Sequence, residues 1–154
     1  MHDDFAIQLN DLFVDTFRII LKVEEATIKK MDSLDLSISE LHLLEAIGRK
    51  KDQKKTISDI ALHLGVTLPS VTVAINKLVK KGYVVKKRCE EDGRIVFVSL
   101  TRLGHKVDLA HSYFHAQMNR KISLGLNEEE KRVMLIAMDK LNGFFKQKLA
   151  DMEV

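Results

Sequence analysis

Short polar side chains and cations gather in the middle of this sequence. On a helix over residues 67–80, one exposed face would carry Ser70, Thr72, Val73 and Asn76. An asparagine amide can hydrogen-bond the edge of adenine at two points, and threonine or valine can touch the methyl group of thymine. Lysine ammonium groups hold phosphates without reading sequence. These residue types predict a surface that reads base edges and grips a phosphate backbone.

The residues expected to contact nucleic acid are Thr67, Pro69, Ser70, Thr72, Val73, Asn76, Lys77, Lys80, Arg88 and Arg94. Lys81 is expected to hold a phosphate as well. No arginine lies on the helix, so strong guanine readout from it is not expected, and each half-site should lean towards A/T. Arg94 is expected to enter a minor groove, which is narrow and negative in A-tracts. Asp92 is expected to stabilise the turn, and an ion pair with Arg94 is the alternative that would make both residues structural.

Two helices joined by a tight turn must present these side chains. Thr56 is the expected N-cap of the first helix, and Gly65 suits the left-handed turn that ends it. Thr67 is the expected N-cap of the second helix, with Pro69 in its first turn, where a missing N–H costs little. Gly82 should end that helix. Its buried face is expected to consist of Val71, Ile75, Leu78 and Val79.

A basic two-stranded hairpin is predicted directly after these helices. Residues 83–88 form a strand rich in β-branched residues, residues 90–93 form the turn, and residues 94–100 return. Val96, Val98 and Leu100 alternate onto one face. Residues 39–101 therefore predict a winged helix-turn-helix lobe that binds double-stranded DNA.

Long helices are predicted on both sides of this lobe. Residues 5–30 and 128–150 have apolar residues on more than one side, which is typical of oligomerisation helices, and residues 102–123 form a connecting helix. Ser39 is the expected N-cap of a helix that ends at Gly48, and a basic loop should follow. The expected fold is one domain over residues 1–154, mainly α with a small β wing.

Charge is unevenly distributed along the chain. The net charge is only +3, but residues 48–106 hold 14 Lys and Arg against 5 Asp and Glu, and the remainder holds 11 against 17. This pattern favours a polyanion as partner of the middle segment alone. Apolar runs are interrupted by charge every few residues, so no membrane span is expected. The lone Cys89 cannot form an internal disulfide, which favours a reducing, cytoplasmic setting.

The motif Asp92-x-Arg94-x-x-x-Val98-x-Leu100-Thr101, followed by Gly104, resembles the wing signature of MarR-type transcriptional regulators. The resemblance covers nearly the whole chain. It implies a homodimer whose first and last helices form a dimerisation layer, with the winged lobes reading two halves of a pseudo-palindrome. It also implies repression by operator occupancy, and a ligand pocket between layer and lobe that changes lobe spacing. No cofactor is required by this scheme.

Two branches of that family are similar to segments of this sequence. Val23 to Thr27, Ile38 to His42 and His111 to His115 look like the branch that controls fatty-acid synthesis genes, whose members respond to long-chain acyl groups on acyl carrier protein. In that case His42, His111 and His115 line or gate the ligand pocket.

The alternative is the zinc-uptake branch, which also places Glu on the first helix and His on the second and fifth. His111 and His115 have the i, i+4 spacing of zinc ligands, and His42 with Glu24 or Glu25 would complete a four-ligand set. A third interpretation is that these histidines bind no metal and form hydrogen bonds along a seam between helices.

Two other classes of function, an enzyme and a protein-binding adaptor, are alternatives to DNA binding. An enzyme is not expected, because the sequence has no glycine-rich phosphate loop and no nucleophile–base pair. A winged-helix adaptor that binds proteins instead of DNA would need a neutral or apolar recognition surface. The cations between Lys77 and Arg94 argue against such an adaptor.

Overall fold

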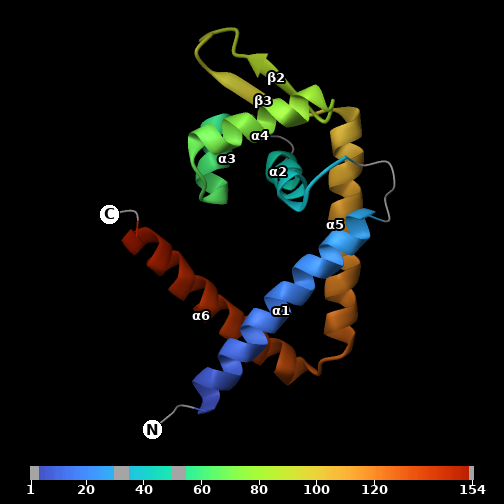
Figure 1. Cartoon of the computed structure of the whole chain (residues 1–154), viewed down its shortest axis with the longest axis vertical. Coiled ribbons are helices and arrows are strands. Elements are labelled where there is room, and N and C mark those ends of the chain that lie inside the picture. The colour runs from blue at the N-terminus through green and yellow to red at the C-terminus, as the bar shows by residue number, and fades with distance from the viewer. Residues whose placement is uncertain (1–3, 30–34, 50–54, 153–154) are drawn as a thin grey trace. The chain divides into compact units, whose positions relative to one another are not determined.

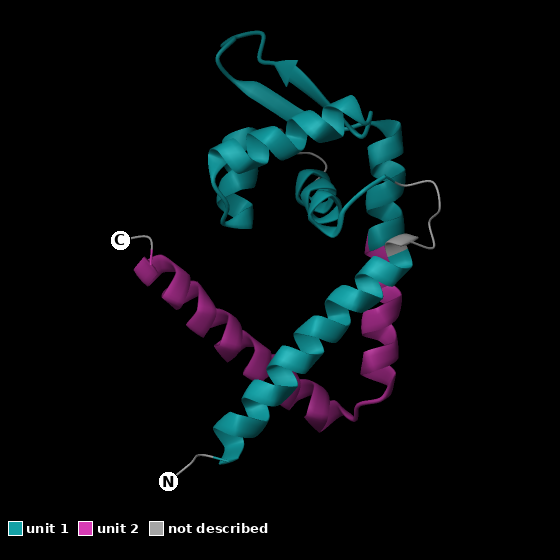
Figure 2. Cartoon of the chain, in the orientation of Figure 1, with its two compact units in different colours: residues 1–111 teal, residues 112–154 magenta. Residues whose placement is uncertain are grey.

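The computed structural model describes residues 4–29, 35–49 and 55–152. The elements in chain order are α1 (Asp4–Lys29), α2 (Ile38–Gly48), β1 (Lys55–Thr56), α3 (Ile57–Leu64), α4 (Leu68–Lys80), β2 (Val84–Arg88), β3 (Val96–Leu100), α5 (Arg102–Leu124) and α6 (Glu128–Met152). Figure 1 shows them along the chain, and Figure 2 shows two compact units, Met1–His111 and Ser112–Val154, which divide within α5. The predicted class, mainly α with a small β wing, is confirmed.

The N-cap of α2 lies two residues earlier than the sequence predicted. Ser37 is the N-cap: the Glu40 backbone N–H donates to its hydroxyl over 3.2 Å, and its own N–H donates to the Glu40 carboxylate over 2.8 Å. The prediction of Ser39 as N-cap was wrong, since Ser39 lies inside the helix. Only Ser37 is followed three residues later by an acidic side chain, which is the capping-box pattern.

The helix-turn-helix is built as the sequence predicted. Thr56 caps α3 in a reciprocal box with Asp59, and the backbone N–H and hydroxyl of Thr56 hold the pKa of the Asp59 carboxyl below its usual value. Gly65 ends α3 with φ 62°, and Thr67 caps α4. The two helices are bent by 115°, within the range of helix-turn-helix units.

Across the described ranges, no single helix is long and apolar enough to cross a membrane. Helices α3 and α4 have the necessary length and composition only when they are taken together across their 115° bend.

The core of the first unit joins α2, α3, α4 and β2. Its largest fully buried side chains are Leu44, Ile60, Ile75, Leu78 and Val84. Val71 is also buried, so three of the four residues predicted for the inner face of α4 are confirmed. The prediction that Val79 is buried was wrong. Its side chain is 37% exposed, because it lies one position, or about 100° of helix rotation, beyond Leu78.

The wing contains one more strand than predicted. β2 and β3 pair antiparallel from Val84↔Leu100 to Arg88↔Val96, and β1 pairs with the other edge of β3. β1 carries Lys55, the last residue of the predicted basic loop; residues 50–54 lie outside the described residues.

Lys55 has a structural role that its charge alone did not reveal. Its ammonium donates to the carbonyl oxygens of Ala46 (2.7 Å) and Ile47 (3.3 Å) at the end of α2. A cation is favourable there, because the last carbonyl groups of a helix have no intrahelical partner. Lys55 therefore stabilises the join between α2 and the sheet.

The start of α5 is fixed tightly to the end of α4. The Thr101 hydroxyl donates to the Gly82 carbonyl over 2.7 Å and accepts from the Gly104 N–H over 3.0 Å. A Cβ at Gly104 would overlap the Tyr83 carbonyl oxygen, so only glycine permits this approach. Close packing against Tyr83 therefore requires glycine at position 104, the last residue of the wing motif.

Both terminal helices have apolar side chains exposed to solvent in the single chain. On α1 these include Phe5, Leu12, Phe13, Val14, Phe17, Ile20 and Val23, and on α6 they include Val133, Leu135, Ile136, Met138, Phe144, Phe145 and Leu149. Helix α6 has no buried residue at all. Asn127 caps α6, since its side-chain oxygen accepts from the Glu130 N–H over 2.9 Å.

Candidate nucleic-acid interface

The exposed face of α4 carries most of the predicted base-reading residues. Ser70, Val73 and Asn76 are exposed, and Thr72 is half-buried. The Thr72 hydroxyl donates back to the Leu68 carbonyl over 2.8 Å, so its methyl group is the part most free to meet a base. Val73 is 57% exposed, so its methyl groups are available to contact the methyl group of thymine.

The first turn of α4 presents Thr67, Pro69 and Ser70, all exposed. The Thr67 and Ser70 hydroxyl oxygens are 2.8 Å apart, and Thr67 accepts from the Ser70 N–H over 3.4 Å. The hydroxyl groups are thereby held at the helix N-terminus, where unsatisfied N–H groups favour an anion such as phosphate. Lys77 and Lys80 are exposed further along the helix.

The wing turn holds Arg94 at the surface. The Arg94 backbone N–H donates to the Asp92 carboxylate over 2.9 Å, and the Ile95 N–H donates to the Asp92 carbonyl over 3.0 Å. Asp92 thus orders the turn through backbone contacts, and the Arg94 side chain remains exposed. Arg88 is also exposed, at the end of β2.

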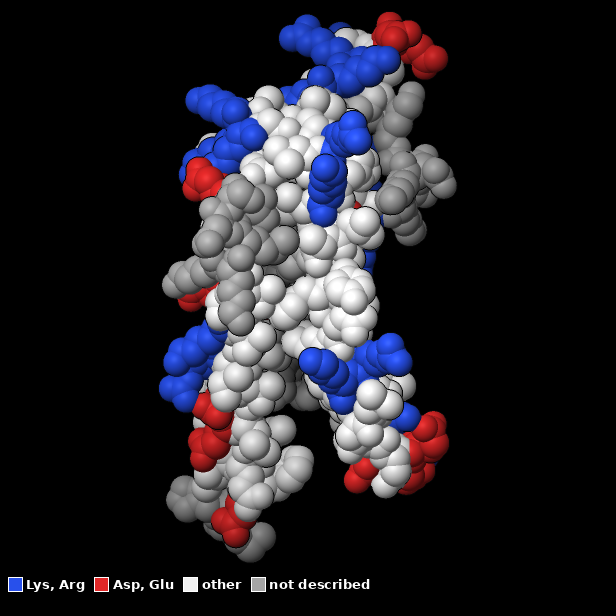
Figure 3. Space-filling view, turned by 90° about the vertical axis from the view of Figure 1, so that its right-hand side faces the viewer, with Lys and Arg blue, Asp and Glu red and all other residues white. Residues whose placement is uncertain are grey.

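Positively charged side chains are exposed along the wing and along α4, the recognition helix of the lobe. The upper end of the space-filling view, where β2 and β3 lie in Figure 1, carries Lys and Arg side chains next to a small group of Asp and Glu (Figure 3). Glu90, which follows β2 by two residues, pairs with Lys87 over 3.3 Å between largely exposed side chains, so the pair is weak.

Lys81 does not belong to this surface, contrary to the prediction. Its ammonium lies 3.0 Å from both carboxylate oxygens of Glu40 and donates to the Asp35 carbonyl over 2.6 Å. Desolvation alone would raise the pKa of Glu40, but hydrogen bonds from Ser37 and Lys81 outweigh it and hold that pKa below its usual value. The hydrogen bond with Glu40 likewise raises the pKa of Lys81.

Lys86 contacts the exposed face of α4 although it was not among the predicted contact residues. Its ammonium on β2 donates to the Asn76 side-chain oxygen on α4 over 2.5 Å. The two residues are ten positions apart and on different elements, so no sequence pattern signals the contact. It arises because the chain reverses at Gly82, where φ is 80°.

Three of the predicted ligand-binding residues come together inside the first unit. The Nε2 atom of His42 on α2 lies 3.7 Å from a carboxylate oxygen of Glu24 on α1, and the rings of His42 and His111 are 5.7 Å apart. Glu24 and His111 are buried, with exposed fractions of 6% and 8%. Glu25 is exposed, so Glu24 is the acid that joins this cluster.

The donor atoms of this cluster fit a metal ion of the zinc type. One atom from each of Glu24, His42 and His111 lies within 4.8 Å of the others, and imidazole with carboxylate is a common zinc donor set. Nδ1 of His111 also lies 3.7 Å from Glu45. His115 follows His111 by four residues on the continuous helix α5, which is the spacing that puts two side chains on one helix face.

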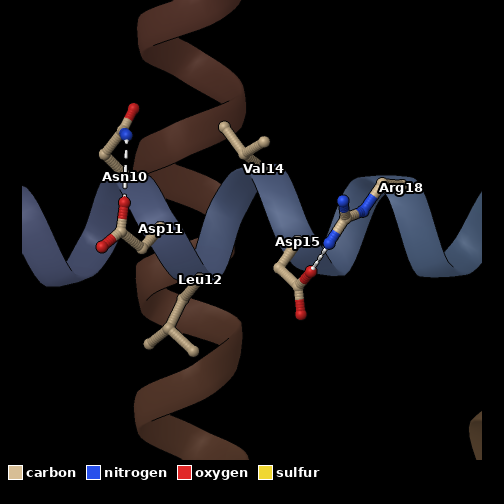
Figure 4. A pocket seen from close by; sticks show the side chains of 6 residues that line it. All are labelled: Asn10, Asp11, Leu12, Val14, Asp15 and Arg18. Carbon is tan, nitrogen blue, oxygen red and sulfur yellow. Dashed lines mark hydrogen bonds and ion pairs between the residues drawn. The ribbon is translucent and has the colours of Figure 1, made fainter.

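A shallow hollow on α1 is a poor candidate for a ligand site. Figure 4 shows its lining residues, Asn10, Asp11, Leu12, Val14, Asp15 and Arg18. All six come from one helix and all are exposed. Arg18 pairs with Asp15, so the hollow offers no enclosed or unpaired polar group around which a ligand would be held.

Comparison with known proteins supports the predicted resemblance. Residues 34–95 match the model of the MarR family. BilQ, an HTH-type transcriptional regulator of Clostridium symbiosum, is 30% identical over 109 residues, which cover 69% of this chain and 72% of BilQ. YfiV, an HTH-type regulator of Bacillus subtilis, is 26% identical over 142 residues, 87% of each chain. The structure of Streptococcus pneumoniae FabT in complex with DNA superposes with a TM-score of 0.87 and 34% identity, over 92% of this chain and 98% of FabT.

Proposed function

Because the chain belongs to the MarR family, we propose that it is a homodimeric repressor of an A/T-leaning, pseudo-palindromic operator. As a family member it is a DNA-binding transcriptional regulator and not an enzyme. The observation that carries the finer proposal is the exposed face of α4, with Ser70, Val73 and Asn76 beside a basic wing. Short side chains on a helix fit a major groove and favour thymine and adenine edges. A DNA partner also favours the cytoplasmic location.

Dimerisation is supported by the apolar side chains exposed on α1 and, separately, on α6. Seven large apolar residues on either helix exceed the exposure normal for a monomer, and a second copy would cover them. Two copies related by a two-fold axis would present two recognition helices to half-sites about one helical turn apart. The predicted symmetry of the operator follows from that of the dimer.

The proposed effector is a long-chain acyl group carried on acyl carrier protein, and the proposed targets are fatty-acid synthesis genes. Support comes from the similarity to FabT, which is 34% identical to this chain and superposes with a TM-score of 0.87. In this scheme the acylated carrier strengthens operator binding, and the cluster of His42 and His111 lines or gates the acyl site.

The experiment that tests the DNA proposal is selection of bound duplexes from a random pool, followed by a salt titration on the winner. We expect an A/T-rich inverted repeat, and an affinity that falls with salt by a log–log slope of about 0.9 per phosphate contact. If no sequence is enriched with or without effector, and binding depends weakly on salt, the winged-helix adaptor hypothesis replaces the repressor.

A second candidate function, zinc-responsive regulation, is favoured by the geometry of Glu24, His42 and His111. Bound zinc would cross-link α1, α2 and α5 and so bias the spacing of the winged lobe. Zinc binding measured by calorimetry on the purified protein tests this idea. We expect His111→Ala to abolish it and His105→Ala, an exposed histidine on the same helix, to leave it intact.

The two effectors are distinguished by one comparison of operator affinity. The selected duplex is titrated with the protein in the presence of long-chain acylated carrier, unloaded carrier, zinc or a chelator. A rise with acylated carrier alone supports the fatty-acid proposal. A rise with zinc that the chelator reverses, and that His111→Ala with His115→Ala removes, supports the metal proposal.

A further inference from the structure

The hydrogen bond between Lys86 and Asn76 fixes the direction of the Asn76 amide. The lysine ammonium has only donors, so the group facing it over 2.5 Å must be the amide oxygen. An isolated asparagine can present its oxygen and its NH2 group either way round. Here the NH2 group points away from the ammonium, and the choice between the two orientations is made by the wing.

The path of the chain between α4 and β2 brings Lys86 and Asn76 together. Helix α4 ends at Lys80, the Tyr83 N–H donates to the Leu78 carbonyl over 2.9 Å, and β2 then runs back beside α4 (Figure 1). Val84 is buried, and the rest of β2 is exposed. The reversal brings the side chain of Lys86 to the exposed face of the helix that carries Asn76.

The Asn76 NH2 group and the Lys86 ammonium together present hydrogen-bond donors to a base edge that contacts the exposed face of α4. Adenine offers one acceptor, N7, and one donor, the N6 amino group, so reading it at two points needs both halves of the asparagine amide. With Lys86 beside the oxygen, an adenine amino group would approach an ammonium of like polarity. Guanine offers two acceptors, N7 and O6, which match the Asn76 NH2 group and a Lys86 N–H.

We propose that Asn76 and Lys86 act as one donor–donor unit that reads a single guanine in each otherwise A/T-leaning half-site. The inference rests on the proposed function, since it requires α4 to enter the major groove. It makes Lys86 a specificity-determining residue rather than a phosphate contact. Asn76 alone would favour adenine, so the wing changes which base the recognition helix selects.

The test is duplex selection with the full-length protein and two matched variants, Lys86→Met and Lys87→Met. Both lysines are exposed on β2, and both changes remove one positive charge per protomer. They differ in direction, because neighbouring residues of a strand point to opposite faces. The wild type should prefer guanine over adenine at one position per half-site by about tenfold, the usual discrimination of a two-point contact.

Lys86→Met should shift that position towards adenine, because no ammonium then lies beside the Asn76 oxygen to repel the N6 amino group. Lys86→Arg should restore guanine, since it restores the donors. Lys87→Met should lower affinity for all sequences alike and leave the base profile unchanged. A shift in base preference is a readout that a purely structural role for Lys86 would not produce.

Two outcomes would overturn the inference. One is a wild-type profile that is an A/T inverted repeat without the guanine, in which case the repressor proposal stands and the donor–donor unit does not exist. The other is a guanine that Lys86→Met leaves as strongly preferred as in Lys87→Met. Failure of the proposed function itself has a different signature, namely no enriched sequence for the wild type with or without effector.

Discussion

Two neighbouring lysines at the end of α4 should affect different properties of the protein when each is replaced by methionine. Lys80 is exposed and available to a phosphate, whereas Lys81 contacts Glu40 and the Asp35 carbonyl. Methionine preserves much of the side-chain length and removes the charge in both cases. We expect Lys81→Met to lower the free energy of unfolding, and Lys80→Met to lower DNA affinity without changing that free energy.

The magnitude for Lys81 follows from its contacts and burial. The side chains of Lys81 and Glu40 are 27% and 12% exposed, with Nζ 3.0 Å from the carboxylate. A hydrogen bond to a charged group contributes about 1.5–3 kcal/mol, and partial exposure screens it, so we expect a loss of about 1–2 kcal/mol. That loss corresponds to a fall in Tm of roughly 2–8 °C for a chain of this size.

For Lys80→Met, the measurable effect is a change in how DNA affinity depends on salt concentration. Each phosphate contact adds about 0.9 to the log–log slope of affinity against salt concentration, and a dimer carries two copies. Lys80→Met should therefore make the slope shallower by about 1.8, the sum over two contacts of that size. Lys81→Met should leave the slope at its wild-type value.

The assays are urea denaturation at one fixed protein concentration, because a dimer's stability depends on concentration, and fluorescence anisotropy of a labelled operator over a range of salt. The reasoning is refuted if Lys81→Met unfolds like the wild type and flattens the salt slope as Lys80→Met does. Lys81 would then bind phosphate, and its contact with Glu40 would contribute nothing to folding.

Three further predictions concern acid stability, packing and the wing. The pKa of Glu40 is depressed in the fold, so its contribution to stability is complete above its unfolded pKa and is lost as the pH falls through the lower folded value. Urea denaturation across the acid range should show this loss of stability. Glu40→Gln should remove this part of the pH dependence. Gly104→Ala should lower stability by about 1–3 kcal/mol, since overlap with the Tyr83 carbonyl outweighs a gain of about 1 kcal/mol in helix propensity; a more stable variant in urea would contradict this packing. Arg94→Ala should weaken operator binding about tenfold with an unchanged circular-dichroism melt, and unchanged affinity would exclude Arg94 from a groove contact.

Local chemistry explains most of what could be foreseen. Thr56, Gly65 and Thr67 mark helix ends through contacts with residues only a few positions away, so their roles can be recognised without the fold. The same logic, applied fully, would have selected Ser37 instead of Ser39, because the Ser-x-x-Glu pattern is visible in the sequence.

Other features depended on long-range contacts. Lys55 and Lys81 look like phosphate contacts because both belong to basic runs, yet each donates to groups in α2 or beside its ends. A third strand of only two residues has too little periodicity to be recognised, and it exists because β3 offers a free edge. The cluster of Glu24 and His42 likewise required two helices to pack.

The sequence by itself determined the helix-turn-helix, the wing, the basic middle segment and the identity of the residues on the exposed face of α4, because periodicity, caps and charge are properties of neighbouring positions. Only the tertiary structure decided which cations are free and which are already paired. It also decided that Lys86 reaches Asn76, since the reversal at Gly82 brings together side chains ten residues apart. A side chain's hydrogen-bonding partner depends on distance in space, and distance in space is what folding adds to the sequence.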